Sequence, residues 1–173
     1  MVRDFPVVTA RFRSVYRRVT DTLTNLGWLP NLVLRLTVGF MFFSGAVGKL
    51  ADLGSFTDMF AALGIPGARY LAPLTAGAEL VGGAGLMLGL GTRVVSLVLA
   101  ADMVGALITD IGPNLAQKYP DWWDFLSNMF YAPEWLLVGL LLWLLCVGPG
   151  KASLDGLVGR RLAATSTADS TPG

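Results

Sequence analysis

Four ionisable side chains interrupt segments of this chain that are otherwise apolar enough to cross a bilayer: Arg35, Lys49, Glu79 and Asp102. An ionisable group in hydrocarbon costs about 3 kcal/mol or more, so groups of both signs are expected to pair or to serve a function. Of the 173 residues, 54% are hydrophobic and 14% are charged, whereas soluble domains carry about 25% charged residues. The sequence therefore predicts an integral membrane protein.

The apolar stretches set the fold class. A bilayer core of about 30 Å needs about 20 helical residues, and the predicted spans cover about 29–50, 71–90, 94–111 and 133–148. A β-barrel is rejected, because barrel strands alternate apolar and polar residues while residues 38–43 and 135–147 are continuously apolar. We predict an all-α, four-helix transmembrane bundle over residues 29–148.

Basic residues predict the orientation, since Lys and Arg near the spans mark the cytoplasmic side. They gather before the first span, in the second connection and after the last span: Arg3, Arg11, Arg13, Arg17, Arg18, Arg93, Lys151, Arg160 and Arg161. Both termini are therefore predicted to be cytoplasmic, in a multi-pass protein of the cell membrane. The first apolar run has full length and no cleavage site, so the N-terminus is expected to stay attached.

Three shorter segments lie outside the predicted spans. Residues 1–28 predict an amphipathic helix that lies on anionic lipid or packs against the bundle or a partner. Residues 55–63 predict a short extracytoplasmic helix capped by Ser55 and closed by Gly64 and Pro66. Residues 149–173 form a predicted cytoplasmic tail, disordered from about residue 163.

The third connection, 112–133, holds an unusual number of aromatic residues. Such rings commonly settle at headgroup depth in an interfacial belt. The alternative is a lid over a pocket or a docking surface for a partner, with Trp122, Trp123 and Tyr131 as candidates. The sequence leaves both interpretations open.

Depth along the spans suggests how the four intramembrane charges pair. Arg35 lies roughly 9 Å and Asp102 roughly 12 Å from the cytoplasmic starts of their spans, so they are a candidate pair. Lys49 ends the first span and can reach Glu79 or Asp110. Either the pairs only fix the packing of the helices, or they line a polar pocket for proton exchange or a quinone-like head group.

The local sequence places these charges inside the bundle. Arg35, Phe42 and Lys49 are seven residues apart and therefore share one stripe of the first helix. Glu79 is surrounded by glycines that allow close helix approach: Gly77, Gly82, Gly83 and Gly85. We expect both stretches to face the bundle interior.

Composition excludes several chemistries. The chain has no histidine, so a bis-histidine haem or a histidine-based metal site is not expected. Its one cysteine, Cys146, cannot form an intramolecular disulfide. No phosphate-cradling loop is present, and no nucleic-acid partner is predicted. Electrons for any redox reaction must therefore come from a partner or a small bound cofactor.

The order of several motifs resembles the DoxX family of small bacterial and archaeal membrane proteins. Arg35 precedes GFMFFSGAVGKL, which is followed by FAALGIPG and then by AELVGGAGLMLGLGTR. The resemblance covers about residues 30–147 and implies a four-helix membrane protein linked to redox metabolism, related to a subunit of a thiosulfate:quinone oxidoreductase. It also implies oxidoreductase, superoxide dismutase or sulfurtransferase partners.

Three functional hypotheses follow. The first is a redox-associated membrane subunit in which Arg35, Lys49, Glu79 and Asp102 line a pocket that could bind quinone. The second is a non-catalytic scaffold that recruits soluble partners through its basic N-terminal helix and its aromatic segment. The third is a small transporter, which would need an oligomer to enclose an aqueous path.

Overall fold

The structure is a computed structural model that describes residues 13, 16–18, 20–22, 24–150 and 152–157. Its elements are α2 (Trp28–Ala51), α3 (Leu53–Ala62), α4 (Ala68–Leu88), α5 (Thr92–Ala106), the π-helix η1 (Leu107–Ile111), α6 (Gly112–Lys118), α7 (Trp122–Tyr131) and α8 (Pro133–Val147). No strand occurs in this part of the chain. The predicted all-α class is confirmed.

Within the described residues, three helices are long and apolar enough to cross a membrane: α2, α4, and the continuous run 92–118. The fourth candidate is a broken span, because α7 and α8 pass the same test only together and meet at a bend of 56°. Large apolar side chains such as Phe40, Val81 and Val94 are mostly exposed on the bundle surface. Such a surface is stable in lipid and not in water, which agrees with a membrane bundle.

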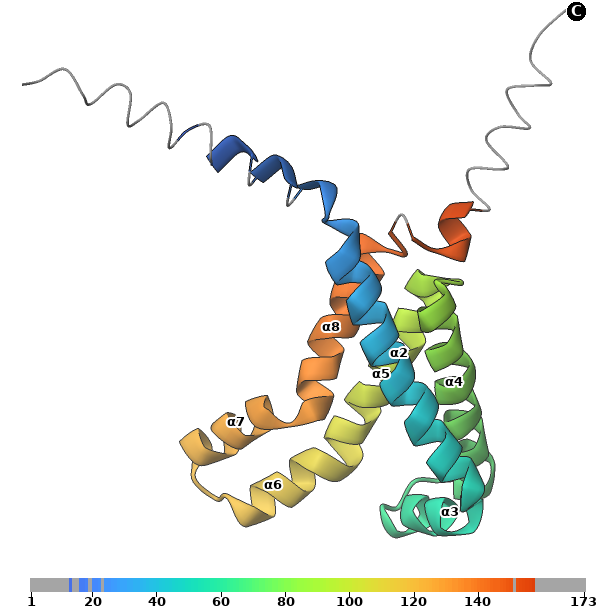
Figure 1. Ribbon diagram of the computed structural model, residues 1–173. Helices are drawn as coiled ribbons and strands as arrows, with labels where there is room; N and C mark the ends of the chain where they lie inside the picture. Colours follow the sequence, from blue (N-terminus) through green and yellow to red (C-terminus); the bar gives the residue numbers. More distant parts are fainter. Residues whose placement is uncertain (1–12, 14–15, 19, 23, 151, 158–173) are drawn as a thin grey trace, which may run out of the picture.

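The bundle consists of two helix pairs. Helix α2 packs along α4, and α5 packs along α8, while α4 and α5 join the pairs. Figure 1 shows the pairs together at one end, where α2 begins and α8 ends, and apart at the other. We call these the terminal end and the distal end. The pairs diverge toward the distal end, and a pocket lies between them in the distal half.

Close contact between α2 and α4 depends on two glycines. A Cβ on Gly39 would lie 2.7 Å from the carbonyl oxygen of Gly83, and one on Gly83 would lie 2.6 Å from that of Gly39. Backbones can approach this closely only where both residues lack a side chain. Gly77, also expected to allow close approach, is not needed for this contact, because a Cβ added there would have nothing within 4 Å.

The apolar core lies mainly in the terminal half. It contains Val38, Phe42, Leu86, Leu99, Leu141 and Leu144, which come from all four main helices. The predicted stripe of α2 does face inward, because Arg35, Gly39, Phe42 and Ala46 are buried. Burial there fixes the rotation of α2 and directs Lys49, one turn beyond Ala46, toward the space between the pairs.

Helix α3 begins earlier than predicted. Asp52, not Ser55, is its N-cap, and the Asp52 carboxylate accepts a 3.1 Å hydrogen bond from the Ser55 amide. This hydrogen bond holds the pKa of Asp52 below its usual range. At the other end, Gly64 adopts a positive φ of 72°, and the Ile65 amide bonds back to Phe60. The expected cap residue was therefore wrong, although a short helix does lie at this place.

The third connection is helical and not a plain loop. Helix α5 continues through the π-helix η1 into α6, so the third span does not end at Ile111. Pro113 lacks the amide that an α-helix needs, and an inserted π-turn can accommodate this loss. Gly112 permits the turn, because a Cβ there would lie 2.7 Å from the Leu107 carbonyl oxygen.

The predicted N-terminal surface helix lies largely outside the described residues, as does the tail from residue 158. The described residues from 13 to 25 are helical.

Candidate functional site

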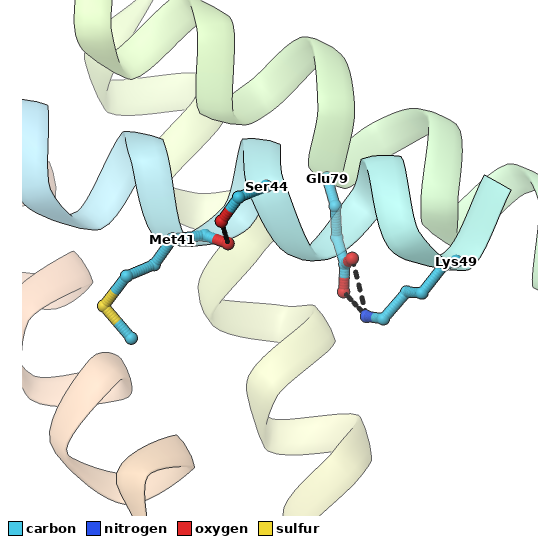
Figure 2. A network of polar contacts seen from close by, with 4 residues as sticks. All are labelled: Met41, Ser44, Lys49 and Glu79. Carbon is cyan, nitrogen blue, oxygen red and sulfur yellow. Dashed lines mark hydrogen bonds and ion pairs between the residues drawn. The ribbon is translucent and has the colours of Figure 1, made fainter. Parts of the chain in front are cut away.

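The site is built around an ion pair between α2 and α4. The ammonium of Lys49 lies 2.5 Å and 2.6 Å from the two carboxylate oxygens of Glu79. Glu79 is 2% exposed, whereas the Lys49 side chain is 32% exposed. Figure 2 shows the Lys49 side chain reaching back along α2 to meet Glu79. Of the two partners predicted for Lys49, the structure brings it to Glu79.

A pocket of about 450 Å³ opens beside this ion pair in the distal half of the bundle. Asp102 of α5 lines it and interacts with both Glu79 and Lys49. One oxygen of Asp102 is buried without a hydrogen-bond partner. A buried carboxylate oxygen without a partner is costly, so a ligand or a proton at this point would satisfy it. Three of the four predicted site residues therefore meet here.

Much of the remaining lining of the pocket is apolar. It includes Phe56, Phe60, Leu63, Ile65 and Leu71, supplied by α3, the following turn and α4. Phe56 also lies under Lys49, with the ammonium 5.1 Å from its ring centre, a distance suited to a cation–π contact. Phe56 and Phe60 were not predicted as site residues, although their spacing of four residues places them on one face of α3.

Two further carboxylates line the same pocket, Asp110 of η1 and Glu134 of α8. Asp110 accepts a 2.6 Å hydrogen bond from Asn114, whereas one Glu134 oxygen is buried without a partner. Asp102, Ala106, Thr109 and Asp110 share one face of their continuous helix, so the lining follows from helical spacing. Glu134 was missed because only the fold brings α8 to this pocket.

Arg35 lies elsewhere, and its predicted pair with Asp102 was wrong. Its side chain is fully buried at the terminal end, where Nη2 donates to the carbonyl oxygen of Ala152. It also lies against Gly89 in the turn that precedes α5. Asp102 is ten residues along α5 from Thr92, or about 15 Å deeper. The two residues were predicted to lie at similar depth, but Arg35 lies level with the turn before α5, whereas Asp102 lies deeper along α5.

The chain after α8 covers the terminal end. Asn31 donates to the carbonyl oxygen of Gly148 at 3.2 Å. The Asp155 carboxylate accepts hydrogen bonds from the amides of Gly91 and Thr92 at 3.0 and 3.3 Å. Asp155 thus caps the start of α5, a residue the sequence analysis did not single out. In this arrangement Arg35 joins α2 to the chain that follows α8.

The three aromatic docking candidates lie on α7, away from the ion pair. Trp122, Trp123 and Tyr131 are 69%, 73% and 85% exposed. Trp123 and Tyr131 line a separate surface groove together with Leu126, Ser127 and Phe130. None of these residues lines the pocket at Glu79. This position fits both an interfacial belt and a docking surface.

Comparison with known proteins identifies the family. The model of the DoxX family matches residues 31–110. The chain is 34% identical over 147 residues to "Uncharacterized membrane protein Rv3486" of Mycobacterium tuberculosis, which covers 80% of this chain and 85% of that protein. The chain belongs to the DoxX family. The matched range contains Lys49, Glu79 and Asp102, whereas Glu134 and the aromatic residues of α7 lie beyond it.

A second relative of this DoxX protein is "Putative oxidoreductase CatD" of Bacillus subtilis. The two are 33% identical over 81 residues, which is 47% of this chain and 59% of the relative. No solved structure matches this DoxX protein.

Proposed function

We propose that this DoxX protein is a membrane subunit of an oxidoreductase system that binds a quinone head group in the pocket at Lys49, Glu79 and Asp102. One observation carries the proposal. An ion pair with a buried carboxylate borders a pocket of about 450 Å³ within the membrane-spanning bundle, and most of the lining of this pocket is apolar. Ligand pockets typically combine such an apolar lining with a few convergent polar groups.

The lining suits the chemistry of a quinone. Its carbonyl oxygens accept hydrogen bonds, and the Lys49 ammonium is a donor at the pocket wall. Its flat ring can pack against Phe56 and Phe60, which stand edge to face with centres 4.8 Å apart. A protonated Asp102 would donate from its partnerless oxygen to a carbonyl oxygen of the quinone.

Reduction of a quinone to a hydroquinone consumes two electrons and two protons. Asp102 and Glu79 are carboxyl groups at the pocket and could pass protons to the ligand. We assign the electrons to an oxidoreductase partner, since the chain has no histidine and one cysteine. The name of the Bacillus subtilis relative supports a redox role. Superoxide dismutase or sulfurtransferase partners remain predictions from the family resemblance.

The test is purification in a mild detergent, followed by mass spectrometry of all retained small molecules and proteins. Wild type is compared with Glu79→Gln, which keeps the shape and removes the charge. Asp58→Asn is the matched control, because Asp58 is an exposed carboxylate of α3 that does not line the pocket. We expect quinone with wild type and Asp58→Asn, and a clear loss of quinone with Glu79→Gln.

A second candidate function is a scaffold without a small ligand. The exposed aromatic groove on α7, about 440 Å³ in volume, favours it as a surface for a protein partner. The same experiment separates the two functions. Protein partners retained equally by wild type and both variants, with no quinone in any of the three proteins, would overturn the quinone proposal and support the scaffold.

A further inference from the structure

The Lys49–Glu79 ion pair borders a second, smaller cavity. This cavity has a volume of about 150 Å³ and lies between α2, α5 and α8. Lys49, Glu79 and Met103 line both cavities. The ion pair therefore stands where the two cavities meet, with the larger pocket on one side and the smaller cavity on the other.

Apart from the ion pair, the second cavity is apolar. Its remaining lining is Met41, Phe42, Gly45, Met103 and Leu137. In contrast, the larger pocket carries three more carboxylates, Asp102, Asp110 and Glu134. The two cavities thus differ in chemistry. One suits a polar head group, and the other suits hydrocarbon.

The smaller cavity reaches the outer surface of the bundle. Met41 is 47% exposed, and a Cβ on Gly45 would have nothing within 4 Å. Figure 2 shows the Met41 side chain pointing from α2 toward α8. These two helices touch far less than α2 and α4 or α5 and α8 do. The cavity is therefore a crevice between α2 and α8 that opens sideways, where the bundle surface is apolar.

We propose that this crevice holds the hydrocarbon tail of the ligand whose head group occupies the larger pocket. The ligand is then a membrane amphiphile, a quinone with an isoprenoid tail, that enters from the bilayer between α2 and α8. This inference rests on the proposed function. Sideways entry lets the head reach Lys49 while the tail stays in an apolar medium throughout, so no hydrocarbon has to be transferred into water.

Gly45 gives a direct test. Gly45→Leu fills the crevice without a backbone clash. Gly48→Leu is the matched control, because Gly48 lies on the same helix, also has open space at its Cβ position, and lines neither cavity. Met41→Phe is a second variant that narrows the crevice from its rim. All three proteins are compared with wild type in detergent micelles of the same composition.

Two quinones with the same head group are used, one with a tail of several isoprene units and one without a tail. We expect Gly45→Leu and Met41→Phe to weaken binding of the tailed quinone at least about tenfold, or about 1.4 kcal/mol, since the larger side chains take the space that the tail would fill. Binding of the tail-less quinone should not change. Gly48→Leu should match wild type for both.

The position of the tail is tested with a tailed quinone that carries a photoreactive group on its first isoprene unit. Crosslinks to Met41 or Leu137 support the proposal if excess unlabelled tailed quinone removes them. The proposal is overturned by crosslinks to Leu71 or Phe60. It is also overturned if crosslinks to Met41 or Leu137 are removed only by excess phospholipid. If Glu79→Gln still abolishes binding of the tail-less quinone in that case, the proposed function stands. If wild type binds neither quinone, both proposals fail.

Discussion

At the scale of residues, the Lys49–Glu79 ion pair forms because Glu79 is buried on α4 and the long side chain of Lys49 extends to it. Glu79 is almost fully buried on α4, and removal of Lys49 would leave its charge without a partner in a medium of low dielectric. We expect Lys49→Met and Glu79→Gln each to lower the thermal unfolding temperature in detergent micelles. The double variant should lose less stability than the sum of the losses in the two single variants, which corresponds to a coupling of about 0.5–3 kcal/mol.

Asp58→Asn serves as the control for that cycle and should unfold like wild type, since Asp58 lies exposed on α3. Strictly additive losses in the double variant would show that the ion pair contributes no interaction energy of its own.

Arg35 supports a different prediction, because it binds the chain that follows α8. Its guanidinium donates to Ala152, and Arg35→Met removes that bond. We expect faster amide hydrogen exchange at residues 152–157 in Arg35→Met. The variant Asp155→Asn should show the same change, since Asp155 caps the start of α5. Adding Asp102→Asn to Arg35→Met should not restore the unfolding temperature. A restored unfolding temperature would support the Arg35–Asp102 pair that was predicted from depth along the spans.

At the scale of elements, the helices were predictable from the sequence, but their breaks were not. Apolar length alone locates α2, α4 and α5, because a span needs a run of about 20 apolar residues. The continuation of α5 through η1 was not predictable in this way, since Gly112 and Pro113 are typical of a helix end. A π-turn that keeps the helix going depends on packing around it, which no local pattern reports.

The contact of α2 with α4 gives a prediction with a control on the same helix. Gly83→Ala places a methyl group 2.6 Å from the Gly39 carbonyl oxygen, so the helices must separate. Gly77→Ala meets nothing within 4 Å and should be neutral or slightly stabilising. We expect a clear fall in unfolding temperature for Gly83→Ala alone. Equal behaviour of the two variants would show that this crossing does not limit stability.

At the scale of the whole molecule, the site is a product of the spread between the two helix pairs. Lys49, Glu79 and Asp102 could be predicted as site residues from the sequence, because an ionisable group in an apolar segment has a high free-energy cost in lipid unless it is paired or functional. The sequence could not indicate that Arg35 belongs to the other end of the bundle, or that α3 and α8 complete the pocket. Those facts depend on how far apart the pairs lie, which is decided by contacts between segments distant in the chain.

The orientation of this bundle in the membrane is the last prediction. The excess of Lys and Arg near the termini predicts that the terminal end faces the cytoplasm. In a Cys146→Ser background, we expect an impermeant maleimide to label Asp58→Cys of the distal α3 in intact cells. It should label Thr22→Cys, at the terminal end, only after the cells are lysed. Because the pocket with Asp110 and Glu134 lies in the distal half, this result would place its proton exchange nearer the outer face. The reverse labelling would invert the protein and place the pocket nearer the cytoplasm.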